Sequence, residues 1–376
     1  MSTASTKGGR CPLCGREESE VAHVGNLPLC DALVRQETRV CRGCGVVFER
    51  STPDQDWSAL YGDVWQRGAL PTAAHRALYA DDARRIGPGN GRTAFEIGCG
   101  GGFLLDELAR AGWKTSGCDP EHAAVELARS KGHAVDARLF EPRAELQADL
   151  VVLGDVLEHQ ADPRAMLRGV RASVAAGGRV YVRVPDLLAI DFESFGDVFG
   201  LQHRVWFTPE TLRECLASEG FEVEIQGSHG RGQHALARLG TPRPWKRPAG
   251  EPERSLALVR RYARSLRARR VEVSDRLAHL AGGEVALYGG GEHAQELLAF
   301  SPLGKLATRV VDGNPALCGK PCGPFTIEAP ESLRARVPNV VVIASRAYQD
   351  EIRAALADLE LRGVEIVALY PPRASA

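Results

Sequence analysis

The feature that most constrains this chain is a run of glycines between an apolar stretch and an amphipathic stretch. Residues 93–97 are apolar and β-prone, Gly98-Cys99-Gly100-Gly101-Gly102 follow, and residues 103–108 carry apolar side chains at helical spacing. This order predicts a strand, a tight turn and a helix. Glycine is required where a backbone bends sharply and lies against a ligand, because it alone tolerates the dihedral angles involved. The stretch therefore predicts an α/β fold with a ligand at the turn.

Two carboxylates accompany the turn. A second predicted strand, residues 114–118, ends in Asp119, about twenty residues after the turn, where nucleotide-binding α/β folds place a carboxylate that holds both ribose hydroxyls. Glu96 lies two residues before Gly98. Its charge would repel a pyrophosphate and attract a cationic ligand, such as one with an amino group and a sulfonium. No glycine stands at the helix-packing position of the dinucleotide fingerprint, so the pattern does not indicate a dinucleotide.

The segment Glu96-Ile97-Gly98-Cys99-Gly100-Gly101-Gly102 resembles the first motif, E/D-x-G-x-G-x-G, of class I S-adenosylmethionine (SAM)-dependent methyltransferases. The resemblance implies a Rossmann-like sheet, SAM as the cofactor and methyl transfer as the reaction. The residues that it assigns to cofactor binding are Glu96, Gly98, Gly100, Gly102 and Asp119. Downstream, Asp155-Val156-Leu157-Glu158-His159 is similar to the family's D-V-L-E-H, and residues 174–178 read VAAGG where the family often has L-x-P-G-G.

The carboxyl ends of the predicted strands supply the remaining site candidates. Ligands bind at these ends in an open parallel sheet, so Asp155 and His159, which follow the apolar strand 148–153, should lie over the glycine turn. Asp155 is assigned to cofactor binding. His159 and His203 are the candidate catalytic bases, and a locally hydrogen-bonded histidine is the alternative interpretation of His159. Tyr61, in a stretch predicted to be helical, is assigned to covering the cofactor, with ordinary packing as the alternative.

The N-terminal segment contains two CxxC pairs, each followed by a glycine. Four thiolates held by two such turns form a tetrahedral zinc site with no vacant position, so the predicted metal is structural. The predicted ligands are Cys11, Cys14, Cys41 and Cys44. Reduced buried cysteines are the alternative, and His23 or Cys30 could replace one ligand although neither lies in a CxxC pair. A core of some fifty residues is too small to fold unaided, so zinc is expected to stabilise this segment.

Composition limits the partners and the compartment. Lys and Arg together number 47 and Asp and Glu 48, so no overall charge attracts nucleic acid or anionic membranes. No apolar run approaches the length of a membrane-spanning helix, and the first ten residues lack an apolar signal core. We therefore expect a cytoplasmic protein that acts on a small molecule, without nucleic-acid or membrane partners.

The chain is predicted to contain four segments. Residues 1–53 form the zinc-binding domain, 54–239 the methyltransferase domain, 240–282 a proline-rich linker with a basic connecting helix expected over about 255–280, and 283–376 a second Rossmann-like domain. The last segment repeats the strand, glycine turn and helix at Gly289-Gly290-Gly291. A tight turn needs glycine with or without a ligand, so ligand binding there is left open.

This layout resembles the zinc-containing sugar C-methyltransferases, which act on nucleotide-linked deoxysugars. HVGNLPLCDALV near the N-terminus and ALYGGGEHAQELL with VVDGNP near the C-terminus also resemble that family. The resemblance implies a nucleotide-sugar acceptor between the middle and last domains, zinc remote from the chemistry, and a role in sugar or natural-product biosynthesis. The family's Tyr-x-Glu-His motif corresponds to Gly200, Gln202 and His203, so only the histidine is kept.

Removal of a carbon-bound proton, which C-methylation requires, needs a tuned base and stabilisation of an oxyanion, whereas O-methylation needs only a base near a hydroxyl. Both acceptors therefore stay open. The sequence predicts SAM-dependent methyl transfer to a sugar or related small metabolite. The alternatives are a SAM-binding scaffold protein without turnover and an RNA methyltransferase, which the near-neutral charge and the lack of an Asn-Pro-Pro-Tyr type base-flipping motif disfavour.

Overall fold

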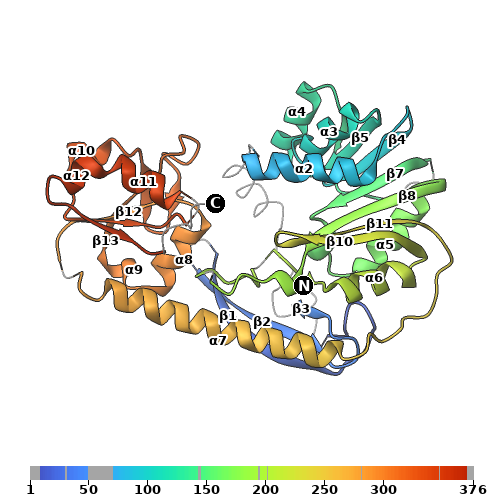
Figure 1. Cartoon of the computed structure of the whole chain (residues 1–376), viewed down its shortest axis with the longest axis horizontal. Coiled ribbons are helices and arrows are strands. Elements are labelled where there is room, and N and C mark those ends of the chain that lie inside the picture. Colours follow the sequence, from blue (N-terminus) through green and yellow to red (C-terminus); the bar gives the residue numbers. More distant parts are fainter. Residues whose placement is uncertain are drawn as a thin grey trace, which may run out of the picture. The chain divides into compact units, whose positions relative to one another are not determined.

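The computed structural model describes residues 9–29, 32–49, 71–142, 145–193, 195–200, 202–280, 282–346 and 348–370. The chain divides into two compact units (Figure 1). Unit 1 takes its described residues from Met1–Gly25, Gln36–Asp191 and Phe199–Arg260, and unit 2 from Asn26–Arg35, Phe192–Val198 and Arg261–Ala376.

The main sheet of unit 1 has seven strands in the order β10-β11-β8-β7-β4-β5-β6. Neighbouring strands from β8 to β6 are parallel, whereas β11 runs antiparallel to both β8 and β10. Helices connect β4 to β5, β5 to β6 and β7 to β8, so the fold is the predicted α/β fold of the Rossmann-like methyltransferase type. The strands are β4 (Thr93–Ile97), β5 (Lys114–Asp119), β6 (Ala134–Ala137), β7 (Ala148–Gly154), β8 (Val174–Pro185), β10 (Phe221–His229) and β11 (Gly232–Leu239).

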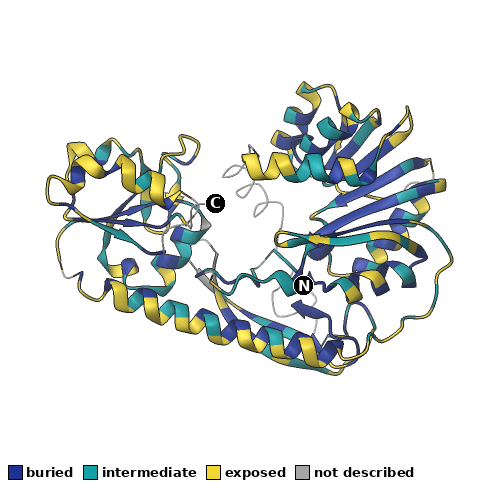
Figure 2. Cartoon of the chain, in the orientation of Figure 1, coloured by how far each residue is buried: buried dark blue, intermediate teal, exposed yellow. Residues whose placement is uncertain are grey.

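Helices cover both faces of this sheet (Figure 1). On one face Ile86 of α2 and Leu104 of α3 pack in one cluster with Tyr181 of β8. On the other face Leu167 of α5 and Leu212 of α6 pack in a cluster with strand side chains. Each helix buries the face that packs on the sheet and exposes the opposite one (Figure 2); the buried positions are mostly apolar, with Asp82 of α2 as a fully buried charged exception. The helices are α2 (Ala73–Ile86), α3 (Phe103–Arg110), α4 (His122–Ser130), α5 (Pro163–Ser173) and α6 (Pro209–Ser218).

The N-terminal segment, of which residues 9–25 and 36–49 belong to unit 1, takes part in a four-stranded sheet of order β1-β2-β3-β9. Its strands are β1 (Ser19–Leu29), β2 (Ala32–Cys41), β3 (Val47–Glu49) and β9 (Val205–Trp206). Strand β9 comes from the methyltransferase region and pairs antiparallel with β3, with Phe48 opposite Val205. Leu13 and Phe48 share one hydrophobic cluster with Leu212 of α6. The two regions thus bury their apolar side chains in a common core.

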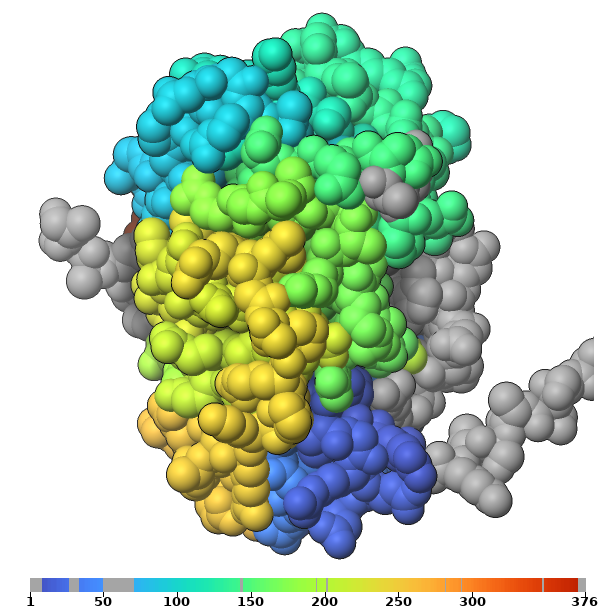
Figure 3. Space-filling view, turned by 90° about the vertical axis from the view of Figure 1, so that its right-hand side faces the viewer, coloured from blue at the N-terminus to red at the C-terminus, as the bar shows by residue number. Residues whose placement is uncertain are grey.

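The start of α7 (Glu251–Leu277) lies against the second CxxC turn. Gly45 has φ +80°, and a Cβ at this position would lie 2.6 Å from the backbone of Glu251. Only glycine fits this close approach. In Figure 3 the yellow atoms of residues near 250 border the dark-blue atoms of the N-terminal segment.

Unit 2 has a six-stranded sheet of order β14-β15-β13-β12-β16-β17, parallel except for β14. It also contains residues 192–198, whose Phe195 is fully buried in the core of this unit. The strands are β12 (Val285–Tyr288), β13 (Ala307–Val311), β14 (Pro321–Cys322), β15 (Phe325–Glu328), β16 (Val340–Ile343) and β17 (Glu365–Ala368). The helices, besides the C-terminal part of α7, are α8 (Glu292–Phe300), α9 (Leu303–Leu306), α10 (Ser332–Ala335), α11 (Gln349–Ala355) and α12 (Ala357–Glu360).

Two predicted helices differ from the observed ones in their bounds. The helix expected over residues 255–280 begins earlier, at Glu251, inside the proline-rich stretch that was predicted to be a linker. Pro252 fits there because the first turn of a helix needs no amide donor, and two glutamates in that turn favour the helix dipole. Of the helical stretch expected before β4, α2 is observed, and residues 51–70 lie outside the described part of the chain. Within the described residues, none of the helices has both the length and the apolar character to cross a bilayer.

Candidate active site

The glycine turn after β4 adopts a left-handed backbone at its three predicted positions. The φ angles are +67° at Gly98, +49° at Gly100 and +72° at Gly102, where side chains are rarely accommodated. A Cβ on Gly98 would lie 2.7 Å from Cγ2 of Val156, and one on Gly102 would lie 3.0 Å from Cδ2 of His133. The turn is therefore closely surrounded and must stay without side chains.

Asp119, at the end of β5, braces this turn. Its Oδ2 accepts a hydrogen bond from the Gly100 amide at 2.9 Å, and its Oδ1 accepts one from the Glu121 amide at 2.9 Å. Burial raises the pKa of this carboxyl, and the two amide bonds oppose the rise. Each carboxylate oxygen has a second lone pair, so the same group can also accept hydrogen bonds from ribose hydroxyls. The structure thus brings Asp119 to the glycine turn, as the sequence predicts.

Glu96 is a buried carboxylate with an unsatisfied oxygen. It is 5% exposed, and its Oε2 has no hydrogen-bond partner within the described residues. Burial raises its pKa well above the ordinary value, and the nearby Arg183 guanidinium opposes the rise. A buried polar group without a partner is costly, which favours a ligand that supplies a donor or a positive charge. The amino group and the sulfonium of SAM have this character, so the residues present fit that cofactor.

Lys131 and His133, which no sequence motif indicates, hold the turn from the side of α4 and Asp106. Lys131 Nζ donates to the Gly101 carbonyl at 2.7 Å and to Asp106 at 2.8 Å. Nε2 of His133 lies 2.7 Å from the second oxygen of Asp106. These contacts fix the carbonyl of the turn, so its amides can face a ligand.

Asp155, at the end of β7, is held in a strained conformation by a buried guanidinium. Its φ is +58°, which is uncommon for a residue other than glycine and often marks a functional position. Arg183 donates to Asp155 and to Asp82 of α2, and Tyr181 donates to Asp82 at 2.5 Å. A Cβ on Gly154 would lie 3.2 Å from the Arg183 guanidinium. The side chain of Asp155 remains 50% exposed, so it can contact a ligand.

Tyr79 of α2 is a further aromatic residue at this end of the sheet. Its ring is stacked on Phe103 with centroids 6.4 Å apart, and the Arg183 guanidinium lies 5.6 Å from the Tyr79 ring. Burial raises the pKa of the Tyr79 hydroxyl. The positive charge of Arg183 opposes this rise, and the negative charges of Glu96 and Asp155 add to it. Tyr61, the tyrosine predicted for cofactor contact, lies outside the described residues. Tyr79 was missed because only the position of α2 beside Phe103 distinguishes it from a packing residue.

The two predicted catalytic histidines lie side by side. The rings of His159 and His203 are 4.9 Å apart, in an edge-on arrangement. His159 Nδ1 donates to the Gln202 carbonyl at 2.8 Å, which fixes the ring. Burial lowers the pKa of His159 and lowers that of His203 to about 3, so both imidazoles are neutral near pH 7. Neutral rings can accept a proton or bind a metal ion.

A second histidine pair lies on the hairpin of β10 and β11. The Nδ1 atoms of His229 and His234 are 3.3 Å apart, and the His234 ring is stacked on Tyr181 at 6.0 Å. His234 is paired in register with Arg183, which contacts Asp155. Burial lowers the pKa of both histidines, that of His234 to about 4. Hairpin register, which the sequence does not show, brings this pair near the end of β8.

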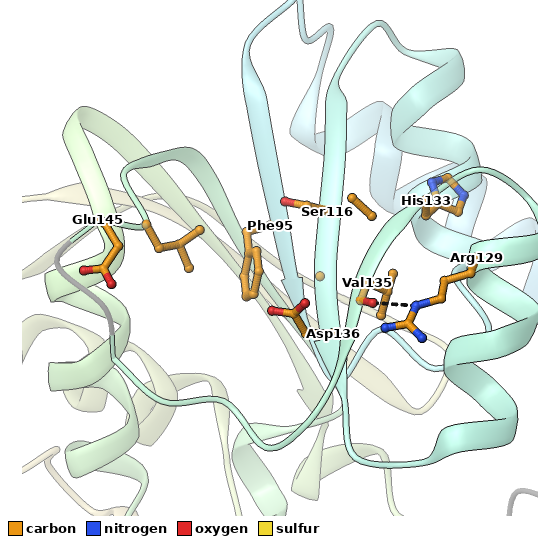
Figure 4. Close-up of a pocket in the computed structure, with 10 residues that line it drawn as sticks. Phe95, Ser116, Arg129, His133, Val135, Asp136 and Glu145 are labelled. Atoms are coloured by element: carbon orange, nitrogen blue, oxygen red, sulfur yellow. Dashed lines mark hydrogen bonds between the residues drawn. The ribbon is translucent and has the colours of Figure 1, made fainter.

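A cavity of about 460 Å³ opens beside the middle of β5 and β6 (Figure 4). Phe95, Ser116 and Val135 line it, and Arg129 of α4, which also lines it, donates to the Val135 carbonyl at 2.9 Å. The three strand residues lie within β4, β5 and β6 and not at their carboxyl ends. The cavity is therefore not part of the predicted site.

The sulfur atoms of the four cysteines in the two CxxC pairs lie within 4.8 Å of one another in unit 1. The sulfurs of Cys11 and Cys44 are 3.6 Å apart, and those of Cys14 and Cys41 are 3.5 Å apart. A tetrahedron of sulfurs about 2.3 Å from zinc has edges of about 3.8 Å. The cluster therefore fits a zinc ion with no open position.

The comparisons with known proteins concern the central part of the chain. The model of a family described as "Methyltransferase domain" matches residues 72–226. The ubiquinone biosynthesis O-methyltransferase of Methylobacterium sp. (strain 4-46) is 38% identical over 153 residues, 35% of this chain and 61% of that protein. The protein of the same name from Bordetella avium (strain 197N) is 29% identical over 141 residues, 33% of this chain and 57% of that protein. The chain thus spans little more than half of the length of these two relatives.

A solved complex of the Haloferax volcanii Trm112 methyltransferase activator with a putative methyltransferase includes a chain similar to this one. The TM-score is 0.42 at 16% identity, over 50% of this chain and all of that chain. Sheet order, glycine turn, carboxylates and the matched family agree on one assignment. Residues 72–226 of this chain are a methyltransferase domain of the class I, SAM-dependent type.

Proposed function

We propose that this protein transfers the methyl group of SAM to a hydroxyl oxygen of a small metabolite. The observation that carries the proposal is the buried, unsatisfied Oε2 of Glu96 beside a glycine turn that Asp119 braces. A neutral or anionic ligand would leave this carboxylate uncompensated, whereas a cationic one pairs with it.

The cofactor would lie over the turn formed by Gly98, Gly100 and Gly102. Asp119 would accept hydrogen bonds from the ribose, and Glu96 would pair with the positive charge of the methionine part. Asp155 and Tyr79, which lie near Glu96 and Arg183, would border the methyl group. The glycine turn, Asp119 and Asp155 lie at the carboxyl ends of β4, β5 and β7, which is the usual ligand position of such sheets.

SAM supplies a methyl group that is already activated by the sulfonium, so the protein mainly has to align the acceptor and remove its proton. The oxygen of the acceptor forms the new bond to the methyl carbon, the carbon–sulfur bond breaks, and its electron pair stays on sulfur. The acceptor proton passes to a base. His159 and His203 are the proposed bases, because their rings lie side by side next to the strand end that carries Asp155.

A nucleotide-linked sugar is the proposed acceptor class. The resemblance of the layout to sugar methyltransferases supports it, and the names of the two relatives support an oxygen acceptor. The absence of a phenol at Gly200 and of a carboxylate at Gln202 also favours oxygen over carbon, since a hydroxyl needs less assistance to lose its proton. The Cys11, Cys14, Cys41 and Cys44 cluster would hold a structural zinc ion that stabilises the N-terminal sheet.

Calorimetry of the full chain with SAM and with its demethylated product tests cofactor binding. We expect saturable binding of both, weakened by Glu96→Gln, while Glu126→Gln, an exposed glutamate of α4, binds normally. A screen of nucleotide-sugars with mass spectrometry then locates the new methyl group. Folded protein that binds neither compound would refute the proposal, and binding without transfer to any acceptor would favour the scaffold alternative.

A further inference from the structure

Glu158, His159 and His203 form a second cluster of metal-ligating groups in unit 1. A carboxylate oxygen of Glu158 and one ring nitrogen of each histidine lie within 4.8 Å of one another. The first two residues belong to a 3-10 turn, Leu157–His159, after β7, and His203 comes from the loop before β9. We propose that these three side chains bind a divalent transition-metal ion, in addition to the zinc site of the cysteines.

The carboxylate of Glu158 is the strongest indication of a cation. The residue is 1% exposed, and neither carboxylate oxygen has a hydrogen-bond partner among the described residues. Both oxygens therefore lack the compensation that a buried carboxylate requires. The positive charge of Arg183 acts on the Glu158 carboxylate, but that guanidinium already pairs with Asp82 and Asp155. A bound cation supplies the missing compensation.

His159 is oriented as metal-binding histidines are. Its Nδ1–H donates to the Gln202 carbonyl at 2.8 Å, so the lone pair of the ring is on Nε2. That atom is the one nearer Glu158, 3.8 Å from Oε1. A hydrogen bond from the second ring nitrogen to a carbonyl is the common arrangement that fixes the tautomer of a metal ligand.

The ligand set indicates the class of metal. Magnesium and calcium prefer oxygen ligands, whereas two imidazoles and one carboxylate suit zinc, iron(II), manganese or cobalt. Three protein ligands leave at least one coordination position for water or for an oxygen of a bound molecule. The separation of 3.8 Å between His159 Nε2 and Glu158 Oε1 is a few tenths of an ångström longer than the edge of about 3.4 Å of a tetrahedron around an ion that binds at about 2.1 Å.

Metal binding at this site does not depend on the proposed function; only the role of the ion, described next, rests on it. It lies next to Asp155, so an acceptor that reaches the methyl group could place a hydroxyl oxygen in the open position. With a cation bound, the ring nitrogens would be occupied as ligands, so the cation would replace the histidines in this step: coordination would lower the pKa of the acceptor hydroxyl, and its proton would pass to solvent. We expect the largest increase in methyl transfer for acceptors with two neighbouring oxygens, such as vicinal diols.

Titration of the full-length protein, loaded with a single equivalent of zinc and freed of excess zinc, with Mn²⁺, followed by electron paramagnetic resonance, tests the site without cofactor or acceptor. Bound Mn²⁺ loses the sharp signal of the free ion, and the thiolate site retains zinc because thiolates prefer it. We expect about one equivalent of Mn²⁺ per chain, with affinity at least tenfold weaker in Glu158→Gln and His203→Gln. The matched controls Glu126→Gln and His122→Gln, both exposed on α4, should bind like the wild type.

Folding of each variant is checked by its thermal transition and by total zinc, which should stay at one equivalent. Cobalt provides a second readout in the wild type alone, since a site of nitrogen and oxygen ligands gives weak visible bands and the cysteine site gives strong sulfur charge-transfer bands. Folded wild-type protein that binds neither Mn²⁺ nor a second Co²⁺ would overturn the inference, as would variants that bind as the wild type does. SAM binding in calorimetry would be unaffected by that result, so the proposed function would stand.

Discussion

Units 1 and 2 each contain a glycine turn after a buried strand, and an aspartate braces both turns in the same way. Asp119 accepts from the Gly100 amide at 2.9 Å and from the amide two residues after itself. Asp312 accepts from the Gly290 amide at 2.7 Å and from the amide of Asn314, also two residues on. The two turns therefore share their main hydrogen bonds, although they lie in different units.

The difference lies in the strand before the turn. Unit 1 has Glu96 two residues before its first glycine, with a buried oxygen that lacks a partner among the described residues. Unit 2 has Leu287 at that position, fully buried in its hydrophobic core. The hydrogen bonds from the turn amides to the aspartate therefore stabilise a strand–turn–helix unit and do not by themselves indicate a ligand. The unsatisfied carboxylate is what distinguishes a turn built for a cationic ligand.

The largest expected effect comes from removing the brace in each unit. Asp119→Ala should weaken SAM binding on the order of 100-fold, about 2.7 kcal/mol, because two hydrogen bonds from ribose to a charged acceptor are lost. Asp312→Ala should leave SAM affinity within about twofold and lower the unfolding free energy by about 1–3 kcal/mol. Calorimetry and chemical denaturation measure the two effects. Equal loss of SAM affinity in both variants would remove the distinction between the turns.

Glu96→Gln should weaken SAM binding by about tenfold and at the same time stabilise the cofactor-free protein above neutral pH. The pKa of Glu96 is raised in the folded state, so the folded protein holds this proton more tightly than the unfolded chain does. Its unfavourable contribution therefore begins as the pH rises above the ordinary value and is complete above the raised pKa. Denaturation of both proteins over a pH series should give curves that diverge with rising pH. Parallel curves would contradict the assignment of a buried, uncompensated charge.

The sequence predicted those features whose residues lie close together along the chain. The strand, the turn, α3 and Asp119 lie within residues 93–119, and their order alone brings the carboxylate to the Gly100 amide. The two CxxC pairs are local in the same sense, since a tight turn closes each pair. Gly15 donates to the Cys11 carbonyl at 3.0 Å and Gly45 to that of Cys41 at 2.9 Å.

Groups whose partners are distant in sequence could not be predicted. Asp82 and Arg183 are separated by 101 residues, and neither lies in a recognisable motif. Lys131 reaches back to Gly101 only because α4 packs beside the turn. Glu158 was read as part of a motif, but its burial, and hence its need for a partner, follows from the packing of the loop that carries His203.

A smaller effect is expected from Asp82→Asn, which tests how far the first turn depends on its surroundings. Asn keeps an acceptor for Tyr181 but removes one of the two charges that hold Arg183, so Asp155 should lose part of its fixed geometry. We expect SAM affinity to fall about threefold and the unfolding free energy to fall by about 1–3 kcal/mol. In unit 2, Asp358→Asn breaks an exposed pair with Arg334 and should change the free energy of unfolding far less, because solvent screens that pair. An equal cost for both variants would contradict the buried ion network.

The smallest expected effect is that of Gly291→Ala, at the last glycine of the second turn. Its φ of −77° suits any residue, and a Cβ there would have no atom of the described residues within 4 Å. Alanine is slightly less favourable than glycine at a helix N-cap but restricts the unfolded chain, so the net change in stability should stay within about 0.5 kcal/mol. Thermal melting measures it, with SAM affinity unchanged. A nucleotide that stabilises the wild type but not Gly291→Ala would show that this turn also needs a bare backbone against a ligand. The buried carboxylate would then decide which ligand a turn accepts, and not whether it accepts one.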